Sequence, residues 1–363
     1  MTDSGIIKLA VFLCIAVPFV LSALFSPVAI RLSKRIGAID VPRDNRRMHT
    51  EPVPRFGGMS IFIATIAAFA LIRAVFDILI PASERDGEPT DKIFAIIVGG
   101  VLIYIVGAID DLKGMKPIVK FACQILCASA VFALGIRIPG ISLLGLSFAG
   151  NMAGDLIFSF IVTVVWIVVI TNTINLIDGL DGLAAGVAAI ASLSIGYAAY
   201  IHGHYTVTLC MVALAGAAGG FLPFNFFPAK IFMGDSGSLF LGFMLATTSI
   251  ISPAKGATVV ATVVPVLVLG VPIFDVVFAV LRRISKGRPI FSADKGHLHH
   301  QLAYIGMGQR RAVLMLYGIS GVMGIAAIVF SRDLYIESIF LFCIALLFIV
   351  VLIWEWNKEN GDK

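Results

Sequence analysis

The chain has 363 residues, of which 59% are hydrophobic and only 13% are charged. Soluble domains are about 25% charged, and the mean hydropathy of this chain is +1.00. A soluble protein of this length needs more polar surface than this sequence supplies, so we predict a polytopic membrane protein. The formal net charge is +5, and no feature indicates a nucleic-acid partner.

Apolar segments recur along the chain at lengths of roughly 20 residues, which is the length that a transmembrane helix needs. They are continuously apolar rather than alternating, which favours helices over a β-barrel. We therefore predict an all-α fold with about 11 transmembrane helices. The first segment follows no basic region and is too long for a cleaved signal, so we expect it to be retained. The predicted segments lie near residues 6–30, 57–80, 92–109, 117–136, 155–174, 183–201, 206–222, 237–253, 257–281, 313–331 and 335–355.

The basic residues predict how these segments are oriented. An odd number of spans places the two termini on opposite sides of the membrane. Most of the 27 Lys and Arg residues lie in the odd-numbered loops and after the last span. Cytoplasmic loops carry an excess of such residues, so we predict an external N-terminus and a cytoplasmic C-terminus.

Four polar clusters fall in loops that this orientation places in the cytoplasm, so they can converge on one site. The first, in "AIDDLKGMK", holds Asp110 and Asp111 at the end of the third segment. Adjacent carboxylates on a helix point in different directions, so one can bind a cation while the other accepts a proton. The alternative for this pair is simple solvation of a helix end.

The second cluster, "NLIDGLDGL", repeats polar residues every third position at Asn175, Asp178 and Asp181. This spacing places them on one stripe if the segment is helical, whereas Gly179 and Gly182 permit an irregular turn. Their oxygen atoms suit a hard cation such as Mg²⁺ rather than zinc. A purely structural turn is the alternative.

The third cluster, "FNFFPAKIFMGDSGSLF", places Asp235 between glycines where the eighth segment begins. The N–H groups at a helix start suit phosphate, although Asp235 can also serve only as an N-cap. Phe232 can stack on a base and Asn225 can hydrogen-bond one, or both can pack inside the protein.

The fourth cluster, "ADKGHLHHQL", lies in a basic loop and concentrates three histidines. Zinc partners are absent at suitable spacing, so imidazole contacts to phosphate fit this loop better. The arginines before it can contact phosphate or lipid headgroups. Asp275 lies inside the ninth segment, where a charge suggests either a function or a paired neighbour. The candidate site residues of the basic loop in this fourth cluster are Arg282, Arg283, His297, His299 and His300.

Together these clusters offer carboxylates for Mg²⁺ and cations for phosphate at a membrane face. Phosphoryl transfer needs chiefly this positioning and charge neutralisation, and the depth of the site suggests that one substrate is a lipid. Five motifs in this order resemble the polyprenyl-phosphate N-acetylhexosamine-1-phosphate transferases, the MraY/WecA/TagO family of membrane enzymes. They are "DVPRDNRRMHTEPVPRFGG", "DDLKGMKPIVKFACQ", "NLIDGLDGLAAG", "PAKIFMGDSGSLFLGF" and "RRISKGRPIFSADKGHLHHQL".

The resemblance implies an activity, a cofactor and a location. Family members transfer a sugar 1-phosphate from a UDP-sugar to undecaprenyl phosphate, release UMP and use Mg²⁺, for which Mn²⁺ is an alternative. The chain is then a single domain, residues 1–363, in the bacterial cytoplasmic membrane, and the resemblance suggests a homodimer. The site is formed by the cytoplasmic loops 31–56, 110–120, 172–186, 223–238 and 282–312.

The resemblance also implies residue roles. Asp235 is the principal Mg²⁺ ligand with Asn175 as a second one, and Asp110 and Asp111 act on the acceptor phosphate. Lys120 lies near the phosphates. The remaining positions bind the nucleotide sugar: Asp178 and Asp181 line its pocket, Asn225 and Phe232 contact uridine, and the loop of His297, His299 and His300 holds the diphosphate and sugar.

The stretch "HLHH", together with the first loop, resembles the branch that uses UDP-GlcNAc to start teichoic acid, O-antigen, common antigen or linker units. The branch that uses UDP-MurNAc-pentapeptide for peptidoglycan ranks second. We expect a single in-line displacement, while a two-step route through an aspartate is the alternative. A lipid or nucleotide transporter is a competing class, but it needs charges near the midplane and paired interrupted helices.

Overall fold

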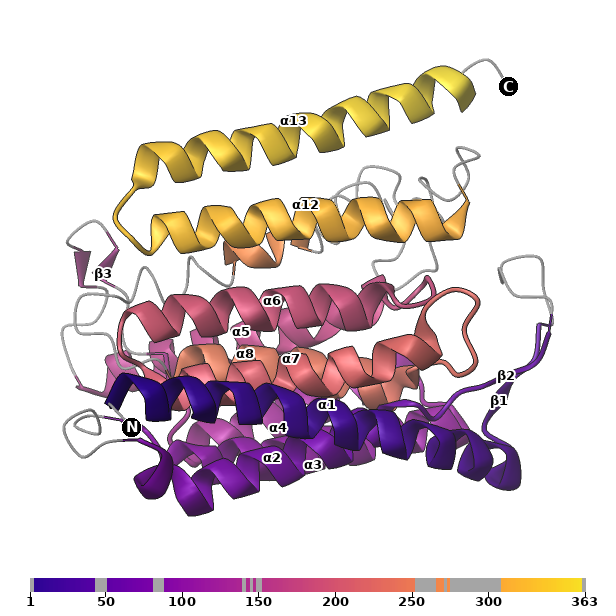
Figure 1. Ribbon diagram of the computed structural model, residues 1–363, viewed down its shortest axis with the longest axis horizontal. Coiled ribbons are helices and arrows are strands. Elements are labelled where there is room, and N and C mark those ends of the chain that lie inside the picture. Colours follow the sequence, from indigo (N-terminus) through magenta and orange to yellow (C-terminus); the bar gives the residue numbers. More distant parts are fainter. Residues whose placement is uncertain are drawn as a thin grey trace.

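The computed structural model describes residues 3–42, 51–80, 88–138, 142–143, 146–147, 152–251, 266–270, 273–274 and 308–360. In this part of the chain, ten long helices run roughly side by side (Figure 1). They are α1 (Asp3–Ile36), α2 (Gly58–Leu79), α3 (Lys92–Lys113), α4 (Pro117–Ala133), α5 (Met152–Ile177), α6 (Leu183–Ile201), α7 (Tyr205–Asn225), α8 (Gly234–Ile250), α12 (Gln309–Phe330) and α13 (Tyr335–Asn360).

Strands are confined to two short antiparallel pairs in the described residues. Strand β1 (Ile39–Asp40) pairs with β2 (Val53–Pro54), and β3 (Ser142–Leu143) pairs with β4 (Leu146–Ser147). The prediction of an all-α fold is therefore confirmed. Ten of the predicted apolar segments coincide with a helix, and most of the remaining one, 257–281, lies outside the described residues.

Seven of these helices are long and apolar enough to cross a membrane, which agrees with a multi-pass membrane protein. The predicted number of spans and their orientation stay predictions. The seven helices are α1, α2, α3, α5, α6, α7 and α12.

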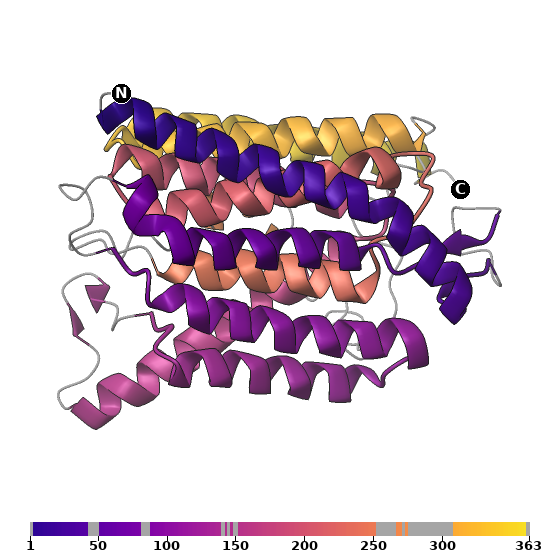
Figure 2. The same cartoon turned by 60° about the horizontal axis from the view of Figure 1, so that its bottom comes forward.

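Helix α8 lies in the centre of the bundle, and nearly all of its side chains are buried. It packs against α3 and α5, while α1 and α7 pack against each other at the side of the bundle (Figure 2). Glycines permit this close packing, because a Cβ at Gly216 or Gly220 of α7 would collide with the backbone of α1. Small residues bring membrane helices together in the same way in many proteins.

Glycines also bring three helix ends together at one end of the bundle. A Cβ at Gly58, the first residue of α2, would collide with the backbone at Gly237 of α8. A Cβ at Gly107 of α3 would lie 2.5 Å from the carbonyl oxygen of Asp235. The starts of α2 and α8 and the end of α3 therefore meet, which places Asp110, Asp111 and Asp235 in one region.

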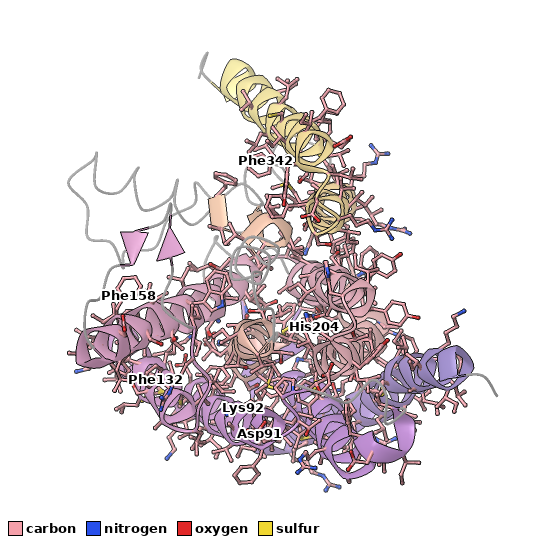
Figure 3. All side chains as sticks on the ribbon, turned by 90° about the vertical axis from the view of Figure 1, so that its left-hand side faces the viewer. Asp91, Lys92, Phe132, Phe158, His204 and Phe342 are labelled. Carbon is pink, nitrogen blue, oxygen red and sulfur yellow. The ribbon has the colours of Figure 1, made fainter. Side chains whose placement is uncertain are left out.

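Figure 3 views the bundle from the opposite end, where Lys92 begins α3 and His204 precedes α7. Helix α12 packs on α6, and α13 packs on α12, so these two helices project from the rest of the bundle.

Candidate active site

The adjacent residues Asp110 and Asp111 face different partners. The Asp111 side chain is fully buried, and its two oxygens accept the backbone N–H groups of Asp235 at 2.8 Å and Ser236 at 2.9 Å. The Arg55 Nε atom lies 3.2 Å from Asp111 Oδ1. Because the first N–H groups of a helix lack intrahelical partners, a carboxylate there satisfies them and interacts favourably with the helix dipole. Asp111 thus caps α8 from another helix.

Gly234 is required by this cap. Its φ is +73°, and a Cβ there would lie 2.5 Å from Asp111 Oδ2. The sequence suggested that phosphate could bind the start of α8 or that Asp235 could be an N-cap. Instead, Asp111 occupies the N–H groups of Asp235 and Ser236, and Asp235 lies in the first turn of α8.

The Asp235 carboxylate contacts the side chains of Arg55, Lys120 and Asn175, which together with it form the hub of the site. Its Oδ1 atom lies 3.0 Å from Lys120 Nζ and accepts a 2.6 Å hydrogen bond from Asn175 Nδ2. Its Oδ2 atom accepts from the Arg55 guanidinium at 3.0 Å. Asn175 Nδ2 also donates to Ser238 Oγ at 2.8 Å. Residues from the first loop, α4, α5 and α8 therefore meet at one carboxylate that stays 17% exposed.

Asp110 faces this hub. Its Oδ2 atom lies 3.0 Å from Lys120 Nζ, and its Oδ1 atom accepts the Met115 N–H group at 2.6 Å. The Lys120 ammonium thus bridges Asp110 and Asp235, in the position that a cation takes between two carboxylates.

Arg55 is a site residue to which the sequence analysis assigned no role. Its backbone N–H donates to Ala38 O at 2.8 Å, and the neighbouring Pro54 O accepts the Phe232 N–H at 2.8 Å. These bonds tie the first loop to the segment that precedes α8. Burial lowers the pKa of the Arg55 guanidinium, but the carboxylates of Asp111 and Asp235 outweigh this effect and raise it above its ordinary value. Its place two residues before a pair of glycines, Gly57 and Gly58, was the available sequence signal.

The segment "NLIDGLDGL" is a helix end followed by a turn, not one continuous stripe. Helix α5 ends at Ile177, so Asn175 is helical, whereas Asp178 and Asp181 lie in the turn before α6. Gly182 has a φ of +82°, a left-handed conformation that favours glycine. The irregular turn that the glycines permitted is therefore the one observed.

Hydrogen bonds from three directions hold this turn. Asn225 Oδ1 accepts the Gly182 N–H at 3.1 Å, and the Tyr317 hydroxyl of α12 donates to Gly182 O at 2.5 Å. Asp181 Oδ2 accepts the Ala229 N–H at 2.9 Å. Asn225 Nδ2 donates to the Ile231 carbonyl at 3.0 Å, so both ends of this buried amide bind the protein itself. The predicted contacts of Asp181 and Asn225 with the nucleotide stay predictions.

Asp178 carries an unusual protonation equilibrium. Burial and the nearby Asp235 carboxylate raise its pKa to about 8. The folded protein therefore binds a proton at Asp178 at neutral pH that an unfolded chain releases, since an ordinary Asp has a pKa of about 3.9. Folding stability at this site decreases as the pH rises from about 4 to about 8.

An Asp178→Asn variant should not undergo this loss, because its amide cannot ionise. We expect its Tm to exceed that of the wild type by an amount that grows from pH 5 to about pH 8 and is then constant. Thermal denaturation in detergent across this range measures the difference. Asp155→Asn, which changes an exposed carboxylate of α5, is the control and should follow the wild type. A difference that does not change with pH would contradict the assignment.

The roles of the other predicted site residues stay predictions. Phe232 is half-buried, and its backbone N–H donates to Pro54 O of the first loop, while its predicted contact with uridine stays a prediction. Most of loop 282–312 lies outside the described residues, and so do Asp275, Arg282, Arg283, His297, His299 and His300.

Known proteins resemble this chain over most of its length. Residues 93–253, which include Asp110, Lys120, Asn175 and Asp235, match Glycosyl transferase family 4. A Bacillus subtilis relative described as a probable undecaprenyl-phosphate N-acetylglucosaminyl 1-phosphate transferase is 35% identical over 352 residues, which are 97% of this chain and 93% of the relative.

Two further relatives have names that specify different substrates. The decaprenyl-phosphate N-acetylglucosaminephosphotransferase of Mycobacterium tuberculosis is 37% identical over 82% of this chain and 76% of its own length. The phospho-N-acetylmuramoyl-pentapeptide-transferase of Streptococcus thermophilus is 30% identical over 80% of this chain and 88% of its own length. The resemblance inferred from the five motifs is confirmed, and the chain belongs to glycosyl transferase family 4.

Proposed function

We propose that this protein transfers GlcNAc 1-phosphate from UDP-GlcNAc to undecaprenyl phosphate and releases UMP. The observation that carries this proposal is the convergence of Asp110, Lys120, Arg55 and Asp235 at one end of a bundle of apolar helices. Such a site can neutralise and orient phosphates beside a lipid. The B. subtilis and M. tuberculosis relatives, whose names specify GlcNAc transfer to a polyprenyl phosphate, support the substrates.

We propose different tasks for these residues. In the in-line displacement, a non-bridging oxygen of the acceptor phosphate attacks the sugar-linked phosphorus, and UMP leaves. Asp110 accepts a proton from the acceptor phosphate or orients it, since one of its oxygens is held by the Met115 N–H. Lys120 and Arg55, which are already anchored on carboxylates, neutralise charge on the phosphates. The turn that contains Asp178 and Asp181 lies beside Asp235 and forms a wall of the nucleotide-sugar pocket.

The residues present fit Mg²⁺ if the substrate completes the coordination. No group of three or more His, Cys, Asp or Glu side chains within the described ranges is arranged to hold a metal by itself. Mg²⁺ commonly binds one or two carboxylates plus substrate phosphates, and Asp110 and Asp235 already hold a cationic group between them. Asp235 would hold the ion, with Asn175 beside it, and Mg²⁺ would supply charge neutralisation at the diphosphate. Mn²⁺ is the alternative ion.

We further propose that the site faces the cytoplasm of a bacterial cell. Basic residues at this end of the bundle support the orientation. They include Lys34 and Arg35 at the end of α1, and Lys113, Lys116 and Lys230 near the site. The homodimer stays a prediction.

UMP release by the purified, detergent-solubilised protein tests the function. We expect release with undecaprenyl phosphate, Mg²⁺ and UDP-GlcNAc, and much less with UDP-MurNAc-pentapeptide, whose named transferase is the less similar relative at 30% identity. The assay needs no sealed compartment, so a transporter would give no UMP. Release only with UDP-MurNAc-pentapeptide would move the chain to the peptidoglycan branch.

A further inference from the structure

A second polar contact joins α4 to α5 one helical turn deeper than Lys120 and Asn175. Gln124 Nε2 donates to Asn172 Oδ1 at 3.3 Å, and Asn172 Nδ2 donates back to Gln124 Oε1. The Gln124 side chain is buried, with only 2% of its surface exposed. These two residues carry none of the roles described so far.

The amide pair lies on the same helix faces as two residues of the hub. Gln124 follows Lys120 by four positions on α4, and Asn172 precedes Asn175 by three on α5, so each pair shares one face of its helix. The two faces therefore meet twice: once through the amides, and once through Asp235 Oδ1, which binds Lys120 Nζ at 3.0 Å and Asn175 Nδ2 at 2.6 Å.

We propose that the Gln124–Asn172 amide pair is a positioning element that fixes α4 against α5, so that Lys120 and Asn175 reach the same oxygen of Asp235. Apolar contacts between helices tolerate sliding, whereas hydrogen bonds weaken steeply when distance and angle change. A buried amide without its partner is costly, so the paired geometry is strongly preferred. The residues touch no reacting group and act through Lys120 and Asn175.

Asn172 is suited to this role because it is itself fixed. Its Nδ2 atom also donates to Val168 O, one turn earlier in α5, at 2.8 Å. The bond leaves its other hydrogen directed at Gln124, and the orientation of one amide therefore determines that of the other.

The reactivity of Lys120 tests the proposal without any substrate. Reductive methylation with formaldehyde and a borane reductant needs an accessible amine, and Lys120 Nζ is held between two carboxylates with its side chain only 16% exposed. In the full-length, detergent-solubilised protein, peptide mass spectrometry should show slow modification of Lys120 relative to the exposed Lys113 and Lys116. Gln124→Leu and Asn172→Leu should each raise the Lys120 rate by about three-fold or more, because the ammonium leaves its bridging position.

Matched variants separate positioning from general damage. The exchanged pair Gln124→Asn with Asn172→Gln keeps two facing amides and should restore slow modification. Ser129→Ala on α4 removes only a bond to Ile125 O within the helix and should leave the rate unchanged. If a leucine variant does not fold, Gln124→Asn alone, which shortens the amide by one methylene, carries the same expectation. An unchanged Lys120 rate in folded variants, or an equal rise in Ser129→Ala, would overturn the proposal.

Turnover gives a second readout, which rests on the proposed function. The leucine variants should lose about ten-fold or more in kcat, while KM for UDP-GlcNAc stays within about two-fold, because the loss arises at the reacting phosphates. A lower Tm with unchanged kcat would mean that the pair only stabilises the fold, and the proposal would be wrong. If the wild-type protein releases no UMP, the proposed function fails, whereas the methylation rates still decide the role of the pair.

Discussion

Replacing Asp235 with alanine is expected to lower kcat by about a thousand-fold or more, since single electrostatic groups in active sites contribute on this scale. The carboxylate holds Lys120 and Arg55 at 3.0 Å each and orients Asn175. Its removal leaves two cationic groups without their anchor and deletes the proposed ligand of Mg²⁺. UMP release per folded protein, measured with saturating UDP-GlcNAc, checks this result.

Two variants control for general damage. Asp235→Asn keeps the shape of the side chain and an oxygen for Lys120 or Asn175, but it lacks the charge, so it should also be strongly impaired. Asp155→Asn changes an exposed acidic residue in the first turn of α5, at the opposite end of that helix from Asn175, and should keep full turnover. An Asp235→Ala protein with activity within about ten-fold of the wild type would remove Asp235 from the catalytic groups.

The sequence was sufficient to predict the helical architecture because length and continuous apolarity are strong signals for membrane helices. It also placed Asp110, Asn175 and Asp235 near the ends of apolar segments, and each lies within one turn of a helix end. Several helices extend beyond the predicted apolar segments, whereas α2 and α4 are shorter than theirs. For example, α1 continues to Ile36, and hydropathy alone leaves out its last turn because that turn carries Lys34 and Arg35.

The sequence could not predict which side chains contact each other within the site. Neighbouring residues on a helix point about 100° apart, since a turn takes 3.6 residues, so only the packing of α3 on α8 determines which of Asp110 and Asp111 enters the protein. That packing depends on a glycine at position 107, where a Cβ would lie 2.5 Å from Asp235 O. Arg55 was missed for a similar reason, because its position depends on backbone bonds between segments that are far apart in the sequence.

These contacts indicate different roles for Asp110 and Asp111, which the sequence motif suggests act as one catalytic pair. Asp111 is fully buried with a guanidinium and two backbone N–H groups as partners, so its carboxylate supports the start of α8. Asp110 is 10% exposed, and its Oδ2 atom shares Lys120 with Asp235. We therefore expect Asp110 to act on substrate and Asp111 to hold the residues that do.

The matched variants Asp110→Asn and Asp111→Asn should consequently fail in different ways. Asparagine at 111 places an NH₂ group against a backbone N–H or the Arg55 guanidinium and removes the charge from an ion pair in which only the carboxylate is fully buried. Breaking a fully buried pair costs about 3–5 kcal/mol, and solvent at the 35% exposed Arg55 side chain reduces this cost, so the apparent Tm in detergent should fall by a few degrees. Asparagine at 110 still accepts the Met115 N–H, and its Tm should change little, while kcat falls by about a hundred-fold or more.

Thermal denaturation and UMP release on the same preparations distinguish the two roles. For Asp111→Asn, lowering the assay temperature well below its Tm should recover part of kcat, because the folded fraction rises and α8 can return to its position. For Asp110→Asn, cooling should recover nothing relative to the wild type, since the missing group acts in the reaction itself. If both variants lose kcat equally at every temperature and keep the wild-type Tm, then Asp111 also acts on substrate, and its contacts with Asp235 and Ser236 must open during turnover.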